Sequence, residues 1–255
     1  MQITAILPVS RIKYLDRVID SLLNQTLKPQ SLLVVYDGPD RDLIEARNKI
    51  VGLDFRQVLF VKSNNNKVAL SIPDRRRHIT SIHNQIKELI VDADWLFSIE
   101  DDGILPTDAL AKLVKFVRVN PNVGMITGVE LGRWGVPYVG AWRVDDVNNV
   151  EKVVSVENKT ADPCVEEIDG CGLYCALIDA NLYKIHDFTT SNGLGPDVNL
   201  GLFLRQQEKQ NYIDWSIQVT HLTNRHGLEI EIPATDTSKQ VTLSKMRNGK
   251  WAVSR

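Results

Sequence analysis

Short apolar runs alternate with stretches of helical periodicity through the first half of the chain, and this alternation limits the fold more than any other feature. The predicted strands are residues 3–9, 32–36, 58–61, 95–99 and 123–127. Between the first two strands, apolar side chains recur at the three- and four-residue spacing of a helix. Such alternation is typical of a doubly wound, mostly parallel sheet with helices on both faces, so we expect an α/β fold.

The second half of the chain has a different pattern. Residues 134–156 carry Gly, Pro, aromatic residues and alternating valines, which predict a loop followed by a hairpin. The remaining predicted elements are a strand over 172–178, helices over 179–185 and 197–210, and a strand over 213–220. The 255 residues therefore fit one α/β domain with an additional lobe.

Composition and charge exclude several classes of protein. A hydrophobic fraction of 43% supports a sizeable core, and a net charge of -2 indicates neither a nucleic-acid nor a membrane-surface partner. The N-terminus lacks the layout of a signal peptide, and no apolar run has the length of a membrane span. We therefore expect a cytoplasmic protein without stable membrane insertion. Three cysteines, an odd number, predict reduced thiols packed in the core.

Acidic residues follow two of the predicted strands. Asp37 ends the second strand, and Glu100, Asp101 and Asp102 end the fourth. Ligands of open α/β sheets bind beyond the carboxyl ends of the strands. Adjacent carboxylates there repel each other, and a hard divalent cation such as Mg²⁺ or Mn²⁺ relieves that repulsion. The alternative is a solvated turn that is acidic without binding anything.

Three further features each allow two interpretations. Arg75-Arg76-Arg77 at the start of a predicted helix suits a phosphate group, or is a solvated basic turn. Asp197, which leads another helix, is either a helix cap or a general base. His221 is either structural or a metal ligand. The other histidines show no constellation and are expected to be structural: His78, His83, His186 and His226.

Taken in chain order, these segments resemble the inverting GT-A glycosyltransferases of family two. The resemblance runs from residue 3 to about residue 223, most of the chain. The segments that carry it are Ile6-Leu7-Pro8-Val9-Ser10, Leu22-Leu23-Asn24-Gln25-Thr26, Val34-Val35-Tyr36-Asp37-Gly38, Ile99-Glu100-Asp101-Asp102, Ile168-Asp169-Gly170-Cys171-Gly172, Gly195-Pro196-Asp197 and Val219-Thr220-His221. It implies a GT-A fold with a hairpin and loop lobe on the acceptor side.

The resemblance also implies a role for each matched position. Asp197 would be the catalytic base, and Asp102 and His221 would bind Mn²⁺ or Mg²⁺. The implied substrate-binding residues are Pro8, Ser10 and Asp37 at the nucleobase, Arg77 near the diphosphate, Asp101 at the ribose or metal, and Asp169 and Gly170 at the donor sugar. The reaction would transfer a hexosyl or pentosyl group from a nucleotide diphosphate-sugar, expected to be a UDP-sugar, with inversion.

The implied division of the chain has three parts. Residues 1–128 would bind the nucleotide-sugar, residues 129–223 would bind the acceptor and carry the base, and residues 224–255 would form a polar, basic tail. The acceptor is left open between a saccharide, a lipid-linked sugar and a modified DNA base, and the oligomeric state is also left open. Aromatic residues of the middle segment either stack on the acceptor or pack the hairpin on the sheet: Trp134, Tyr138 and Trp142.

Two departures from the family pattern keep other functions in view. Glu100 stands where the family has its first aspartate, and Pro196 precedes the implied base. Both leave open a non-catalytic, glycosyltransferase-like binding module. A sugar nucleotidyltransferase is a second alternative, but that chemistry requires a Gly-rich loop after the first strand, where this chain has Ser10-Arg11. If Asp197 is not the base, Asp169 is the next candidate.

Overall fold

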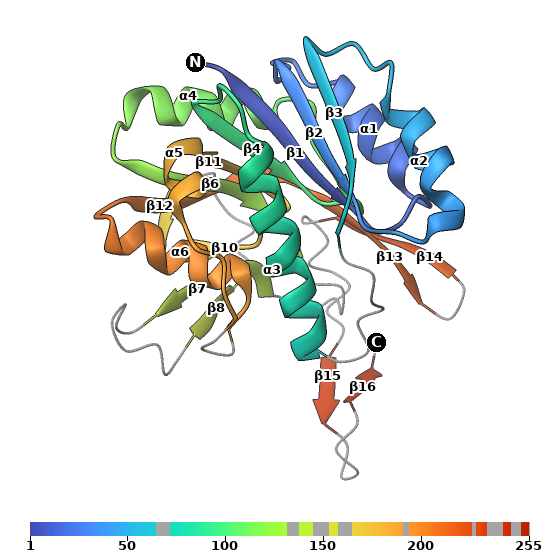
Figure 1. Ribbon diagram of the computed structural model, residues 1–255. Coiled ribbons are helices and arrows are strands. Elements are labelled where there is room, and N and C mark those ends of the chain that lie inside the picture. The colour runs from blue at the N-terminus through green and yellow to red at the C-terminus, as the bar shows by residue number, and fades with distance from the viewer. Residues whose placement is uncertain are drawn as a thin grey trace.

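The computed structural model describes residues 1–64, 72–131, 138–144, 153–157, 165–190, 194–225, 228–233, 242–245 and 251–254. Its centre is an eight-stranded sheet in the order β3-β2-β1-β4-β11-β6-β12-β9 (Figure 1). The strands are β1 (Ile3–Val9), β2 (Ser31–Tyr36), β3 (Gln57–Lys62), β4 (Trp95–Ile99), β6 (Val123–Val129), β9 (Val165–Ile168), β11 (Cys175–Asp179) and β12 (Gln210–Gln218).

Most neighbours in this sheet are parallel, as the sequence predicts. Strands β3, β2, β1 and β4 run parallel to one another, and β12 runs parallel to β6. Strand β11 is antiparallel to both of its neighbours, β4 and β6, and β9 is an antiparallel edge strand. The insertion of β11 between β4 and β6 was not predicted, because periodicity reveals a strand but not its partner.

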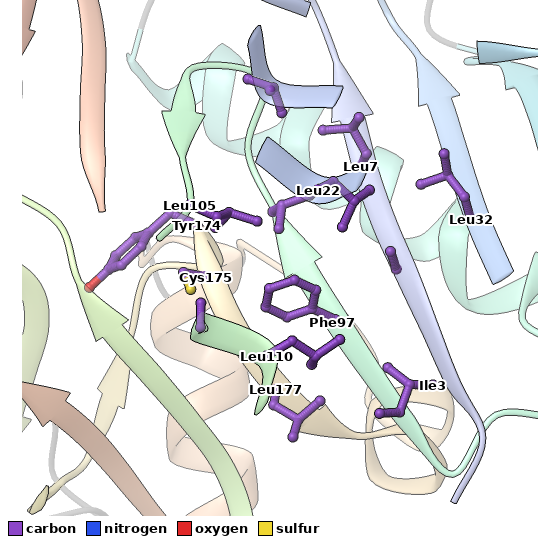
Figure 2. Close-up of a cluster of buried hydrophobic side chains, with 14 of the residues drawn as sticks. Ile3, Leu7, Leu22, Leu32, Phe97, Leu105, Leu110, Tyr174, Cys175 and Leu177 are labelled. Carbon is purple, nitrogen blue, oxygen red and sulfur yellow. The ribbon is translucent and has the colours of Figure 1, made fainter. Parts of the chain in front are cut away.

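Helices cover both faces of the sheet, and the strand side chains alternate between two cores. Ala5, Leu7 and Leu32 face a core shared with α1, α2 and α4, part of which Figure 2 shows. Ile6 and Leu33 face the other core, shared with α3, α5 and α6. The helices are α1 (Leu15–Leu23), α2 (Leu43–Ile50), α3 (Ile72–Leu89), α4 (Ala109–Val119), α5 (Ala180–Ile185) and α6 (Pro196–Gln206). Burial on both faces explains why these strands are continuously apolar.

Three smaller sheets complete the structure. Strand β7 (Tyr138–Val144) pairs with β8 (Val153–Glu157), the predicted hairpin, and with β10 (Gly170–Cys171). Strand β13 (Thr220–Arg225) pairs with β14 (Leu228–Pro233) and with β5 (Gly103–Ile104). The last pair is β15 (Thr242–Lys245) with β16 (Trp251–Ser254). Among the described residues, no helix is long and apolar enough to cross a membrane.

The predicted strand over 213–220 ends earlier, because the chain changes sheets at Val219. The Val219 N–H donates to Val129 O at 2.8 Å, beside β6, and the chain then enters β13. His221 therefore lies within a second strand, opposite Gly103 of β5, rather than at the end of the first one. This register brings His221 next to the loop that follows β4.

A buried glutamine connects two of the helices. Gln25, which is 3% exposed, donates from Nε2 to Ser21 O at the end of α1 and to Pro106 O. Its Oε1 accepts from Leu110 N in the first turn of α4. The helix α4 begins at Ala109, and its free N–H groups are satisfied partly by Gln25.

Two buried histidines lie in an aromatic cluster between α3, α5 and α6. His83 Nδ1 is 2.7 Å from the Tyr183 hydroxyl and its ring stacks on Phe188, which also contacts the ring of His186. Burial is the main cause that lowers the pKa of both imidazoles to about 4, and at His83 the neighbouring His186 contributes to this decrease. Both histidines are therefore neutral parts of the core near pH 7.

We expect the free energy of unfolding to decrease as the pH falls from 6.5 towards 4, because the unfolded chain takes up these protons before the folded protein does. For His83 the loss at the acid end is about 3 kcal/mol. Urea unfolding of the wild type and of His83→Gln, at about pH 7 and about pH 4.5, measures it. The variant cannot titrate at this position and should lose less stability than the wild type. Equal losses would show that His83 is not responsible.

Candidate functional site

Four buried ionisable side chains gather where the strands β4 and β6 end. Asp101 and Asp102 follow β4 and are 5% and 0% exposed, and Glu130 follows β6 and is 6% exposed. His221 of β13 is 4% exposed and faces them. The Leu222 N–H donates to Asp102 O at 2.7 Å, which fixes β13 against this loop. Because β1 also ends at this edge, the predicted acidic cluster meets the residues that follow β1.

The Asp101 carboxylate is bonded to the loop after β1. Its Oδ2 accepts from Ser10 N at 2.7 Å, from Ser10 Oγ at 2.9 Å and from Arg11 N at 2.8 Å. Its Oδ1 accepts from Arg11 Nη2 at 2.7 Å. Asp101 and Ser10, both predicted to bind substrate, thus bind each other, and a contact of either one with a nucleotide remains a prediction. Pro8 lies nearby in β1, opposite Val35.

Arg11 bridges the two aspartates. Its Nη2 lies 2.7 Å from Asp101 Oδ1 and 2.7 Å from Asp102 Oδ2. Burial alone would lower the pKa of this guanidinium, but the charges of the two carboxylates outweigh burial and raise it. Arg11 is therefore a permanent cation at the centre of the acidic cluster.

His221, which belongs to β13, also contacts Asp102. Its Nδ1 lies 3.0 Å from Leu131 O and 3.7 Å from Glu130 Oε2, and its Nε2 lies 3.4 Å from Asp102 Oδ2. Burial lowers the pKa of the imidazole, yet Asp102, Glu130 and the Leu131 carbonyl together raise it to about 9. In the absence of another cation, His221 is thus protonated at neutral pH and adds a second positive charge.

Asp102 and His221, the residues predicted to bind a metal, would supply part of the ligand set of such an ion. Among the described residues, no group of three or more His, Cys, Asp and Glu side chains is arranged to hold a metal ion. Asp102 Oδ2 and His221 Nε2 are 3.4 Å apart. Two adjacent ligands of one octahedral ion, each about 2.1 Å from it, are about 3 Å apart. An oxygen and a nitrogen donor at this spacing therefore suit two positions around a divalent cation, next to the guanidinium of Arg11.

Asp37 lies at the end of β2 and is bonded to a histidine. Its side chain is 4% exposed, and Asp37 Oδ2 contacts His78 Nε2 of α3. The Asp37 N–H donates to Val9 O at 2.7 Å, which holds this turn against the end of β1. His78 was expected to be structural; its position instead makes it a neighbour of the predicted nucleobase-binding residue.

Two arginines at the start of α3, Arg76 and Arg77, interact with different carboxylates. Arg77, predicted to bind near the diphosphate, is 64% exposed and is bonded to Asp74 one turn earlier. Arg76 instead acts on Asp197, because its positive charge lowers the pKa of that carboxyl. A diphosphate contact of Arg77 remains a prediction, and Arg76 is the arginine of this run that lies near the implied base.

Asp197 is half-buried in the first turn of α6. The helix N-cap is Gly195, and a Cβ there would lie 2.3 Å from Asp197 Oδ1, so a larger residue at this position would displace the carboxylate. Burial raises the pKa of Asp197, while hydrogen bonds from the N–H groups of Val198 and Asp197 itself, and then Arg76, oppose the increase. Asp197 therefore stabilises the helix start and is also a carboxylate of increased basicity, so both interpretations of this residue fit the structure.

Asp169 and Gly170 lie where β10 packs against α6. Asp169 Oδ2 accepts from Val144 N at 2.8 Å, and its Oδ1 lies 3.4 Å from Arg205 Nε. Gly170 packs directly on the indole of Trp142, which is 7% exposed, so Trp142 packs the hairpin rather than facing solvent. Trp134 and the side chain of Tyr138 lie outside the described residues. Asp169 is thus held by its neighbours, which weakens it as the second candidate for the base.

The remaining predictions concern the cysteines and one histidine. Cys171 and Cys175 are free and buried in the core, as predicted, and burial raises the pKa of Cys175 to about 12. Cys164 and His226 lie outside the described residues.

Sequence reasoning missed two charged residues of this cluster, Arg11 and Glu130. Both follow predicted strands and lie at the same edge as Asp37 and Asp102. The rule that located the acidic residues, attention to the residues just beyond strand ends, would also have found these two.

We expect Asp101→Ala to lower the free energy of unfolding by about 3 kcal/mol, because it leaves the Arg11 guanidinium and the donors after β1 without their acceptor. Glu231→Ala, which removes an exposed carboxylate paired with Arg17, should cost less than about 0.5 kcal/mol. Urea unfolding compares the two variants. A similar small loss in both would show that Asp101 does not hold the β1 and β4 ends together.

Comparison of the sequence with protein-family models and with curated proteins finds no match. The fold is similar to solved structures of glycosyltransferases. GalNAc-T7 with UDP, GalNAc and Mn²⁺ gives a TM-score of 0.61 at 12% identity, over 89% of this chain and 44% of that one. The mannosyltransferase PcManGT from Pyrobaculum calidifontis, in complex with GDP-Man and Mn²⁺, gives 0.52 at 14% identity, over 84% of this chain and 56% of that one.

A third similar structure is S. aureus TarS 1-349 in complex with UDP-GlcNAc, with a TM-score of 0.51, 14% identity, and coverage of 84% of this chain and 56% of that one. The present chain thus spans about half the length of these glycosyltransferases. The mostly parallel sheet and this similarity agree with the architecture expected from the sequence. The chain has the GT-A glycosyltransferase fold.

Proposed function

We propose that this chain is a glycosyltransferase that moves a sugar from a nucleoside diphosphate-sugar, expected to be a UDP-sugar, to an acceptor hydroxyl with inversion at the anomeric carbon. The observation that supports it best is the buried cluster of Asp102, His221 and Arg11 at the strand ends of a GT-A fold. Similar structures with UDP, GDP-Man and UDP-GlcNAc add support for a nucleotide-sugar donor.

The donor would lie along the edge formed by the ends of β1, β2 and β4. Asp37, held by His78 and by the backbone of Val9, offers a carboxylate to the donor groups of a nucleobase. The backbone near Pro8 and Ser10 borders the same turn. The diphosphate would then lie towards Arg11 and His221, the cations of the cluster.

Mn²⁺ or Mg²⁺ held by Asp102 and His221 would supply Lewis-acid stabilisation of the charge on the departing diphosphate. The resident side chains contribute electrostatic stabilisation of their own. Arg11 brings a fixed positive charge to the place where the leaving group becomes negative, and the low exposure of Asp102 and His221 keeps water from screening it.

Asp197 would accept the proton of the acceptor hydroxyl. As the acceptor oxygen attacks the anomeric carbon, the bond from that carbon to the diphosphate breaks and the proton passes to the Asp197 carboxylate. Attack opposite to the leaving group inverts the anomeric configuration. Burial raises the pKa of Asp197, which makes this carboxylate a better proton acceptor than an exposed aspartate.

The structure disfavours the nucleotidyltransferase alternative. That chemistry uses free N–H groups after the first strand to hold a triphosphate, whereas here the N–H groups of Ser10 and Arg11 donate to Asp101. The binding module remains a distinct outcome of the experiments below.

A thermal-shift screen with UDP and GDP, in Mn²⁺, Mg²⁺ or EDTA, tests the donor site. We expect one diphosphate to raise the melting temperature in a metal-dependent way, because a ligand that binds only the folded state stabilises it. Asp102→Asn should remove the metal-dependent part of the shift, whereas Asp108→Asn, at an exposed carboxylate of α4, should keep it. An unchanged shift in Asp102→Asn would refute the metal assignment.

Donor hydrolysis tests the base without knowledge of the acceptor, because water replaces the hydroxyl. Asp197→Asn should keep the thermal shift with the diphosphate and lose on the order of 10²–10⁴-fold in rate. Asp179→Asn is the matched control, since Asp179 also begins a helix, α5, with a carboxylate bonded to backbone N–H groups. The wild-type rate should fall as the pH drops through the pKa of Asp197, which lies above the usual 3.8.

Each other outcome has a defined meaning. An equal rate in Asp197→Asn and Asp179→Asn would place the base elsewhere. A diphosphate-dependent shift without hydrolysis or transfer to saccharide, lipid-linked sugar or modified DNA acceptors would favour the binding module.

A further inference from the structure

We infer that the guanidinium of Arg11 is a resident cation that competes with a divalent metal for Asp102, so that metal binding requires Arg11 to leave this carboxylate. This inference rests on the proposed function. It concerns one atom, Arg11 Nη2, which lies 2.7 Å from an oxygen of each aspartate.

Arg11 and a divalent metal would compete for the same oxygen atom of Asp102. Asp102 Oδ2 faces Arg11 Nη2 at 2.7 Å and His221 Nε2 at 3.4 Å. A metal ion held by Asp102 and His221 would share Asp102 Oδ2 with Arg11 Nη2, and the positive charges of the metal and of the guanidinium would repel each other there. Asp102 is 0% exposed and His221 is 4% exposed, so little water screens the repulsion between the guanidinium of Arg11 and the metal.

The two aspartates depend on Arg11 to different degrees. Without the guanidinium, Asp101 keeps hydrogen bonds from Ser10 N, Ser10 Oγ and Arg11 N. Asp102 instead faces the charges of Arg11 and His221. Withdrawal of the side chain therefore leaves the β1–β4 connection in place and changes mainly the charge around Asp102, the residue that would take the metal.

Arg11 is attached in a way that permits this withdrawal. Its side chain is 40% exposed, and both ion pairs are made through Nη2. Its Nε is buried without a hydrogen-bond partner among the described atoms. Movement of the guanidinium therefore breaks no hydrogen bond at this nitrogen.

This arrangement couples the metal to the donor. In the free protein, Arg11 balances the buried carboxylates and weakens the binding of a metal on its own. A nucleoside diphosphate brings negative charge that attracts both the metal and the released guanidinium, so the two ligands should bind cooperatively. Loss of the Arg11 charge should strengthen metal binding alone and reduce that cooperativity.

Mn²⁺ titrations followed by electron paramagnetic resonance test the inference directly, because only free aqueous Mn²⁺ gives the full signal. The titration is made on the wild type, Arg11→Met and Arg17→Met, each with and without UDP or GDP. Methionine keeps most of the stem of Arg11 and removes its charge. Arg17 is the matched control, a half-exposed arginine of α1 paired with Glu231 outside the cluster.

We expect Arg11→Met to bind Mn²⁺ at least about tenfold more tightly than the wild type without nucleotide, and to gain less from added diphosphate. Arg17→Met should match the wild type. Asp102→Asn introduced into Arg11→Met should abolish the gain. Arg11→Gln replaces Arg11→Met if circular dichroism shows that the methionine variant is not folded.

Mn²⁺ affinity that is equal or weaker in folded Arg11→Met or Arg11→Gln would overturn the inference, as would the absence of Mn²⁺ binding by every variant. Failure of the proposed function is distinguishable from these results. Tighter Mn²⁺ binding by Arg11→Met, together with no response to any nucleoside diphosphate, would support the inference and remove the donor site. A normal diphosphate response with no effect of Arg11 would overturn the inference and leave the donor site in place.

Discussion

The hydrogen bonds between Asp101 and the backbone after β1 are the interaction on which the rest of the site depends. They join the ends of two adjacent parallel strands, β1 and β4, through one carboxylate. Because Arg11 directly follows Ser10 in this connection, its side chain lies beside both aspartates. The register of β13 against β5 then brings His221 to the same point. Each position follows from the one before it.

Charge balance explains the unusual ionisation of the cluster. Asp101, Asp102 and Glu130 are nearly inaccessible to water, and buried carboxylates of this kind require compensating charge. Arg11 and the protonated His221 supply it, which is why the pKa of the imidazole increases despite burial. The cluster is therefore arranged to hold positive charge, whether from its own side chains or from a ligand.

Local patterns predicted the class of fold and much of the composition of the site, but not how its parts meet. The runs in β1, β2 and β4 are apolar because both faces are buried, and that property is visible in sequence. The place of β11 between β4 and β6 depends on pairing with segments far away in the sequence, which no local pattern encodes. The break at Val219 and the pairing of Arg11 with both aspartates are also long-range contacts. Asp37, Asp102 and His221 were predicted and lie at this edge of the sheet, whereas Glu130 was not predicted and His78 was expected to be structural.

The direction of β11 has a consequence for how such a protein can diversify. Strand β6 ends at the site, next to Glu130, and the antiparallel β11 begins at the same edge, after Cys171 and Tyr174. The intervening chain therefore leaves and rejoins the sheet at the edge that carries the ionic cluster, and of the strands described between β6 and β11 only β9 pairs with the central sheet, at its outer side. Replacement of residues beyond Leu131 and before β9 would leave the inner strands and the side chains of their ionic cluster unchanged while altering the chain that enters and leaves the sheet at that edge. Under the proposed function, one scaffold would in this way acquire new acceptors by exchange of a single contiguous stretch of gene.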